Sequence, residues 1–502
     1  MSVMLDGFLQ IFNIYPLLFI FIGVVIGIIF GAMPGLSATM AVTLFLPITF
    51  GMNHIHGLSL LLGLFIGGIS GGLITAILIN IPGTPSSIAT AFDGYPMTLK
   101  GEAGKALGVG VVYSFIGGLI SFLGLIFLAP QISNLALKFS PIEYFSITAF
   151  SLTLIASMAG SSVIKGLLSG FVGLSIALIG PSPIDGTTRF TFGFHQFDGG
   201  LNLIAVLIGI FAIPEIIKAS RKSVSVQESI DANVDKIRGF GFSLKEFITQ
   251  IPNMVRSALI GLGIGILPGI GGGTSNTVSY LAAKNSSKHP EKYGTGIIDG
   301  VIASETANNA SIGGALIPLL TLGIPGDPVT AVLLGGLMIH GITPGPMFLV
   351  NNRSLFYSIF MILIIGNIFM LVTEFFGIKF FVKMLNVPKQ FLYPIIVVLC
   401  AVGAFGSTNR IFNVFAMLIC GVVGYLLDKY KFPLTPIILS YILGPLVEAN
   451  LRRGLMFSDG SFFAFFKSPI AAFFMGLGII SLLGATYREI RNLIRRRKKI
   501  VK

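Results

Sequence analysis

A group of polar residues, Glu305, Thr306, Asn308 and Asn309, precedes one of the most apolar stretches of the chain, 312–324. Carboxylate, hydroxyl and amide oxygens suit a hard cation such as Na⁺, and a carboxyl group inside a membrane can also carry a proton. We therefore interpret the four residues as candidate coupling-ion ligands on an unwound turn. The alternative is that Glu305 lies at the water interface with the rest of its loop.

Two Pro-Gly pairs, Pro82-Gly83 and Pro325-Gly326, interrupt apolar runs and are followed by residues typical of a helix start. Backbone groups freed by such a break must be buried in protein or line a polar cavity. The N–H groups and dipole of a helix start favour an anion, and glycine permits close backbone approach or a positive φ. The candidate substrate-binding residues beside helix starts are Gly83, Thr84, Ser86, Ser87, Thr274, Ser275, Asn276, Gly326 and Asp327.

Three charged residues have two possible roles each. Asp93 and Asp327 follow the broken segments, and either could cap a helix end rather than contact a substrate. Arg189, in the stretch RFTFG, could pair with a substrate carboxylate or hold an interfacial loop together. The chain contains neither an HExxH motif nor a Walker A lysine, so we expect no enzyme activity, no cofactor and no metal beyond a possible Na⁺.

The composition indicates a membrane protein. Of the 502 residues, 54% are hydrophobic and 11% are charged, whereas soluble domains carry roughly 25% charged residues. Apolar runs near 20 residues recur along the chain, which predicts an all-α polytopic membrane protein with roughly 11–13 membrane spans in a lipid bilayer. The basic C-terminal tail accompanies no folded basic domain, so we expect no nucleic-acid partner.

The order of the breaks recurs along the chain. Pro34-Gly35 precedes Pro82-Gly83, and Pro268-Gly269 precedes Pro325-Gly326, with polar residues after each pair. This pattern predicts an internal repeat with broken or re-entrant helices, and transporter binding sites lie where such breaks meet. The predicted segments are a first transmembrane repeat at 1–217, a linker at 218–250, a second repeat with C-terminal spans at 251–486 and a basic tail at 487–502.

The distribution of charge predicts the orientation. No Lys or Arg precedes Lys100, whereas the linker and the C-terminal tail are rich in both. Because basic segments stay in the cytoplasm, we expect the N-terminus outside and the C-terminus in the cytoplasm. The first repeat then starts outside and the second starts inside, so the two repeats have inverted topology.

Four stretches carry a resemblance to a known family: NIPGTPSSIATAFDGYPM (80–97), PGIGGGTSNTVSYLAAK (268–284), ASETANNA (303–310) and LTLGIPGDPVTAVLLGGL (320–337). They closely resemble the large membrane subunit of the tripartite tricarboxylate transporter family. The resemblance implies Na⁺ or H⁺ symport of tricarboxylates or dicarboxylates such as citrate across the cytoplasmic (inner) membrane of a prokaryote. It also implies two partners, a small transmembrane subunit of about four spans and a periplasmic solute-binding protein.

Two other classes of function are alternatives to a transporter. An anion channel would share the re-entrant segments but would favour a symmetric ring of subunits over a pseudo-symmetric pair within one chain. A membrane-embedded enzyme would need a nucleophile beside a general base.

Overall fold

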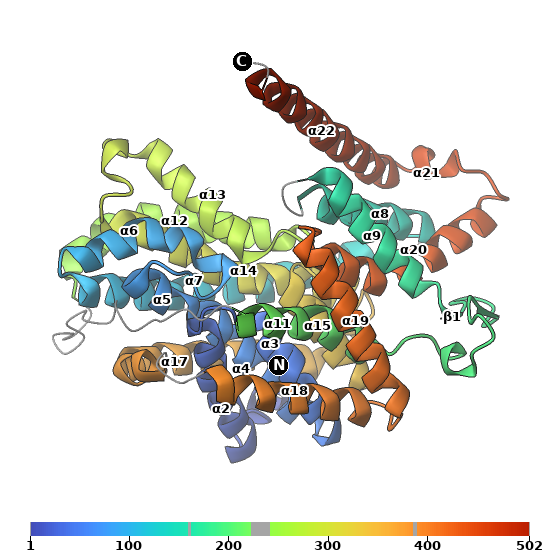
Figure 1. Ribbon diagram of the computed structural model, residues 1–502, viewed down its shortest axis with the longest axis horizontal. Coiled ribbons are helices and arrows are strands. Elements are labelled where there is room, and N and C mark those ends of the chain that lie inside the picture. Colours follow the sequence, from blue (N-terminus) through green and yellow to red (C-terminus); the bar gives the residue numbers. More distant parts are fainter. Residues whose placement is uncertain (1, 159–161, 222–240, 385–388, 501–502) are drawn as a thin grey trace. The chain divides into compact units, whose positions relative to one another are not determined.

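The computed structural model describes residues 2–158, 162–221, 241–384 and 389–500, and most of them lie in helices (Figure 1). Among the described residues, paired strands are limited to β1 (Gly180–Pro181) and β2 (Thr188–Arg189), which are antiparallel. Six described helices are long and apolar enough to cross a membrane, and shorter apolar helices accompany them. The predicted all-α polytopic membrane protein is confirmed, and the predicted number of spans stays a prediction.

The chain forms two compact units. The first contains Met1–Ser133 and Glu215–Gly403, and the second contains Asn134–Pro214 and Ala404–Lys502. Each unit takes segments from both halves of the sequence, whereas the predicted boundaries follow sequence order, so those boundaries stay a prediction. Residues 222–240, most of the predicted linker, lie outside the described residues.

Helices α7, α11 and α18 continue across a boundary between the units, and the other helices belong to one unit each. The first unit holds α1 (Ser2–Leu9), α2 (Ile14–Ala32), α3 (Ala38–Phe45), η1 (Leu46–Gly51), α4 (His54–Ser70), α5 (Gly72–Ile79), η2 (Pro85–Ser87), α6 (Ile88–Leu99), α7 (Ala103–Ala136), α11 (Ile213–Arg221), α12 (Leu244–Ile266), α13 (Gly271–Ser286), η7 (Pro290–Lys292), α14 (Ile298–Leu322), α15 (Pro328–Ile339), α16 (Phe348–Asn351), α17 (Arg353–Met384) and α18 (Lys389–Gly406). The second unit holds α8 (Pro141–Met158), α9 (Val163–Ala177), η3 (His195–Phe197), α10 (Leu203–Leu207), η4 (Ile208–Ala212), α19 (Ile411–Lys429), α20 (Thr435–Phe457), α21 (Ala464–Lys467) and α22 (Pro469–Ile500).

The predicted Pro-Gly breaks separate helices at all four places. Gly35 and Gly269 have φ values of 91° and 78°, which glycine adopts without strain. The other two breaks, Pro82-Gly83 and Pro325-Gly326, each follow a helix that ends at a residue with left-handed backbone conformation. These residues are Asn80 after α5 and Gly323 after α14. A left-handed residue after the last helical turn is a common way to end a helix, so local chemistry accounts for the positions of the breaks.

Glycines bring two pairs of helices into backbone contact within the first unit. A Cβ added to Gly31 of α2 would lie 2.4 Å from the carbonyl oxygen of Gly68 in α4. A Cβ added to Gly265 of α12 would lie 2.6 Å from the carbonyl oxygen of Ser311 in α14. Gly265 lies as far after Gly31 as Pro268 does after Pro34, and Ser311 lies as far after Gly68 as Pro325 does after Pro82. Corresponding positions of the two halves therefore make the same close contact.

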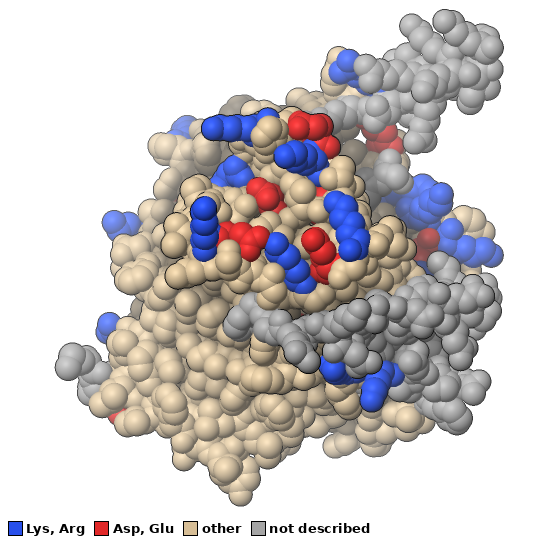
Figure 2. All heavy atoms as spheres, turned by 90° about the vertical axis from the view of Figure 1, so that its left-hand side faces the viewer, with Lys and Arg blue, Asp and Glu red and all other residues tan. Residues whose placement is uncertain are grey.

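The surface charge is unevenly spread. On the face shown in Figure 2, Lys, Arg, Asp and Glu gather in one area, and a broad neighbouring area of the described surface carries few of them. Charged side chains are costly in contact with lipid tails, so the uncharged area is suited to lie within a bilayer.

Candidate functional site

The carboxyl group of Glu305, like the other predicted coupling-ion residues, is fully buried. Glu305 lies on α14 and is 0% exposed. Its Oε1 accepts a hydrogen bond from Thr90 Oγ1 of α6, and its Oε2 accepts bonds from Ser114 Oγ of α7 at 3.0 Å and from Asn308 Nδ2 at 3.5 Å. The carboxylate therefore lies on α14 and is hydrogen-bonded by side chains of α6 and α7. It does not lie in a water-exposed loop.

The expectation of an unwound turn at Glu305 is wrong. α14 runs as one helix from Ile298 to Leu322. Alanines at 303, 307 and 310 favour the helix, and its polar side chains bond locally or to other helices. Asn309 Nδ2, for example, donates to the carbonyl of Glu305 at 3.3 Å. Because neighbouring elements supply the partners, the backbone has no need to unwind.

Asn276 and Thr90 connect this carboxylate to the helix starts. Asn276, on α13, accepts from the backbone N–H of Ala89 at 2.8 Å and donates through Nδ2 to Thr90 Oγ1 at 3.2 Å. Thr90 then donates to Glu305. Asn276, a predicted substrate residue, thus fastens α13 to the first turn of α6 and orients a hydroxyl that contacts the Glu305 carboxylate.

Both broken segments meet the glycine-rich first turn of α13. A Cβ added to Gly271 would lie 3.3 Å from Cβ of Asp327, beside the second break. A Cβ added to Gly272 would lie 3.1 Å from Cβ of Ser86, beside the first break, and 3.0 Å from Asn308 Oδ1. The structure therefore brings the two breaks, the start of α13 and the Glu305 helix together in one place.

The hydroxyl groups of the first break interact with one another. Thr84 Oγ1 lies 2.9 Å from Ser86 Oγ and 3.3 Å from Ser87 Oγ, and all three residues are buried. On α13, Ser275 Oγ donates to the carbonyls of Gly272 at 2.9 Å and Ala307 at 3.2 Å. Thr274 lies half-buried on the same turn. The substrate roles predicted for these residues stay predictions.

The second break is built as a capped helix start. Asp327 Oδ1 accepts from Thr330 N and from Thr330 Oγ1, both at 2.7 Å, and the Thr330 hydroxyl also accepts from Asp327 N. Gly326 accepts a backbone bond from Gly269 N at 2.8 Å, which joins the two breaks of the second half. The capping role weighed for Asp327 is confirmed, and its contact with a substrate stays a prediction.

Gly83 and Gly326 are required by packing. Neither is among the residues with positive φ. A Cβ on Gly83 would lie 2.0 Å from the carbonyl oxygen of Gly31, and a Cβ on Gly326 would lie 2.7 Å from that of Gly265. Of the two reasons expected for glycine at these positions, close backbone approach is therefore confirmed, and a positive φ does not apply.

Several buried oxygen atoms near Glu305 have no hydrogen-bond partner among the described residues. They are Thr306 Oγ1, Asn308 Oδ1 and Asn309 Oδ1, all on side chains that are 0% exposed. Buried polar atoms are rarely left without partners, and neutral oxygens beside a carboxylate are suitable ligands for Na⁺. The four predicted ion residues lie on one helix and include three unpartnered oxygens, and their binding of an ion stays a prediction.

Sequence reasoning missed a second buried carboxyl group, Glu374 of α17. It is 0% exposed, its Oε2 accepts from Ser70 Oγ of α4 at 2.9 Å, and it lies within electrostatic range of Glu305. The signal that could have found it is a single acidic residue inside the apolar run of 355–376, because ionisable groups at membrane depth are functional candidates.

Arg189 lies in the second unit and has protein partners. Its Nη1 donates to Glu448 Oε1 at 2.7 Å, and Arg452 of the same helix as Glu448 lies 2.7 Å from Asp185 Oδ2. The Arg452 side chain holds the pKa of the Asp185 carboxyl well below its ordinary value. The structural role weighed for Arg189 is confirmed, because its guanidinium group ties the polar loop to α20.

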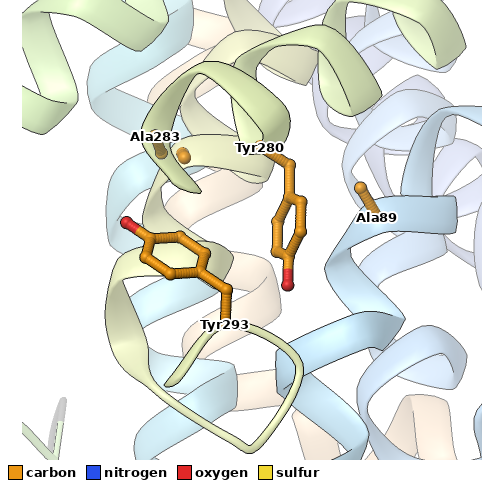
Figure 3. Close-up of a cluster of buried hydrophobic side chains, with 5 residues drawn as sticks. Ala89, Tyr280, Ala283 and Tyr293 are labelled. Carbon is orange, nitrogen blue, oxygen red and sulfur yellow. The ribbon is translucent and has the colours of Figure 1, made fainter. Parts of the chain in front are cut away.

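Asp93 fastens a loop to α6. Its Oδ1 accepts from the backbone N–H groups of Gly294, Gly296 and Ile297 at 2.9, 2.8 and 3.2 Å, and its Oδ2 accepts from the Tyr280 hydroxyl at 2.9 Å. Figure 3 shows the Tyr280 ring between Ala89 and Tyr293 in a buried cluster. Asp93 therefore anchors the segment that leads into α14.

We expect Asp93→Ala to lower the free energy of unfolding by about 3 kcal/mol or more, because three N–H groups and a buried hydroxyl lose their acceptor. The unfolding midpoint of the purified chain in detergent measures this. Asp198→Ala is the control, because that carboxylate is 49% exposed in a pair with His195 and such pairs contribute about 1 kcal/mol or less. Equal midpoints for the two variants would contradict the anchoring role.

Comparisons with known proteins identify the family of the chain. Residues 17–439 match the model of the tripartite tricarboxylate transporter TctA family. An uncharacterized 52.8 kDa protein of the TAR-I ttuC' 3' region of Agrobacterium vitis is 37% identical over 472 residues, covering 94% of this chain and 93% of that protein. An uncharacterized protein of the TAR-II ttuC' 3' region of the same organism is 39% identical over 229 residues, covering 46% of this chain and 95% of that protein.

No solved structure matches the chain. The family match extends over the breaks, α13 and the Glu305 helix, so the residues described above lie within the matched region. The chain belongs to the tripartite tricarboxylate transporter TctA family.

Proposed function

We propose that the chain is the permease subunit that takes up tricarboxylates or dicarboxylates such as citrate, driven by a gradient of Na⁺ or H⁺. It works in the inner membrane of a prokaryote with a small membrane subunit and a periplasmic solute-binding protein that delivers the substrate. The observation that carries the proposal is the meeting of both broken segments at the first turn of α13, beside the Glu305 helix.

The substrate's carboxylates bind at this meeting point. Gly271 and Gly272 carry no side chain of their own in the first turn of α13 and lie against Asp327 and Ser86, and the hydroxyls of Ser86 and Ser87 lie at the first break. Each helix start contributes roughly 0.3–2 kcal/mol to the binding of an anion. A tricarboxylate carries several separated charges, which two or more helix starts can share without a buried arginine.

Asn308 connects the substrate to the coupling ion. Its Nδ2 lies 3.5 Å from the Glu305 carboxylate, and its unpartnered Oδ1 faces the position of Gly272. A cation at Glu305, Thr306, Asn308 and Asn309 therefore alters the same side chain that borders the substrate site. Coupling between two ligands of this kind typically amounts to about 1–3 kcal/mol.

The two halves of the chain form inverted repeats. The matching contacts of Gly31 with Gly68 and of Gly265 with Ser311 support this, as do the corresponding left-handed residues Asn80 and Gly323. With the N-terminus outside and the C-terminus in the cytoplasm, the repeats enter the membrane from opposite sides. Inverted repeats of this kind are the usual architecture of transporters that work by alternating access.

The test is uptake of labelled citrate, succinate and phthalate into proteoliposomes, with the small subunit and the binding protein present or absent. We expect uphill accumulation of at least one of the three when a Na⁺ or H⁺ gradient is imposed, and none when both gradients are collapsed. Accumulation that persists without gradients, or that requires only ATP, would falsify ion coupling. Transport of none of the three acids in any condition would exclude the proposed substrate class.

A further inference from the structure

Glu374 and Glu305 have different hydrogen-bond environments. Glu305 accepts from three side chains, Thr90, Ser114 and Asn308. Glu374 accepts from Ser70 alone, and its Oε1 has no hydrogen-bond partner among the described residues. Hydrogen bonds to a carboxylate stabilise its charged form, and burial without them favours the neutral acid. Glu305 therefore has more donors to stabilise its charged form than Glu374 has.

The helices and ionisable groups around Glu374 support this difference between the two glutamates. α17 packs against α1, α2 and α4, and its Asn367 contacts Gly118 of α7. Glu305 of α14 interacts electrostatically with Glu374. Two nearby buried carboxyl groups do not readily ionise together, so a proton is held by one of them.

Several other ionisable groups of these helices have contacts or exposure of their own. Tyr15 and His56 are in ring contact at the start of α2 and α4, and on α4 that is 14 residues before Ser70, or roughly 20 Å along the helix. Asp6 of α1 adjoins Gly7, which packs against Ser354 near the start of α17. Tyr113 of α7 packs against Phe242 and Phe247. On α17 itself, Lys379 is exposed.

Glu374 also contacts the joint of the first broken segment. Ser70 is the last residue of α4, and α5, which begins at Gly72, leads to the break at Pro82-Gly83. The carbonyl of the preceding residue, Ile69, accepts from Asn308 Nδ2 at 3.4 Å. The same joint is therefore in contact with Glu374 and with the residue that links Glu305 to the substrate site.

We propose that Glu374 binds and releases the proton that is cotransported with the substrate, while Glu305 remains a carboxylate. The carboxylate of Glu374 takes one proton from the side of uptake and loses it to the cytoplasmic side, with Ser70 reorienting its hydroxyl from donor to acceptor. This rests on the proposed function and adds to it a cotransported proton, carried by Glu374, beside the cation proposed at Glu305.

The experiment uses the full chain with its partner subunits in membrane vesicles and measures protons entering per labelled carboxylate entering. We expect Glu374→Gln to lower that ratio by about one proton, because glutamine matches the shape of the acid but binds no proton. Glu291→Gln is the matched control, because the Glu291 side chain is 67% exposed, and it should keep the wild-type ratio. An unchanged ratio in Glu374→Gln overturns the inference.

A second variant keeps the inference testable if Glu374→Gln fails to fold. Ser70→Ala removes the one donor to the carboxylate, which disfavours the charged form. The pH of half-maximal proton-driven uptake should therefore rise by about one unit or more, and an unchanged profile overturns the inference. Wild-type carboxylate entry that is driven by Na⁺ without protons overturns the inference alone, whereas absence of any carboxylate exchange overturns the proposed function.

Discussion

Glu305→Gln is expected to reduce cation-driven accumulation of the transported carboxylate by about 10- to 100-fold, the range of a typical coupling free energy. Glutamine preserves the shape of the side chain but removes the buried negative charge that Thr90, Ser114 and Asn308 stabilise. Without that charge, the site loses its attraction for a cation while the substrate site beside α13 remains. Uptake of labelled substrate under an imposed gradient measures the loss.

The control for this variant is again Glu291→Gln, which removes one negative charge from an exposed position of the same unit. Both variants are compared at equal amounts in the membrane. If Glu305→Gln accumulates substrate at the wild-type level, Glu305 does not bind the coupling ion, and the unpartnered oxygens of Thr306, Asn308 and Asn309 need another explanation.

Adding side-chain bulk at either break is expected to abolish transport. Gly83→Val and Gly326→Val place atoms against the backbone of Gly31 and Gly265, where even a Cβ would lie 2.0 and 2.7 Å from a carbonyl oxygen. Overpacking of this kind costs about 1–3 kcal/mol and sometimes more. Each break must then shift away from α2 or α12, so uptake falls to background in both variants.

Alanine variants at positions 83 and 326 are measured in the same test, and Gly51→Val is its control. A Cβ on Gly51 meets nothing within 4 Å, and its φ is not positive, so that variant should transport like the wild type. Uptake and the amount of folded protein in the membrane are measured together, because packing at the breaks affects both. Wild-type rates in both Gly→Val variants would mean that the breaks do not form the site.

Local chemistry made the breaks and helix starts predictable. Pro-Gly pairs cannot continue a helix, and Asp327 with Thr330 forms a cap that is visible in the sequence. The positive φ of Gly269 follows from the same kind of local signal. These features depend on residues a few positions apart, so the sequence alone contains them.

The features that could not be predicted from the sequence depend on contacts between residues far apart in the chain. The donors to Glu305 come from α6 and α7, and the partner of Glu374 comes from α4, hundreds of residues earlier. Polar residues that gain such partners can remain in a regular helix, which is why the unwound turn was a wrong expectation. The need for glycine at 83 and 326 likewise arises from backbones that only the fold brings close.

The glycines between α2 and α4 have a mechanical consequence. Along this interface the backbone of one helix touches the backbone of the other, as at Gly27 against the carbonyl of Leu64 and at Gly67 against that of Val24. Side chains can change rotamer to absorb a displacement, but a backbone contact cannot. The two helices therefore move as one rigid unit up to the contact of Gly71 with Ile28, and a change of direction between α2 and α3 is left to the break at Gly35, whose φ is 91°.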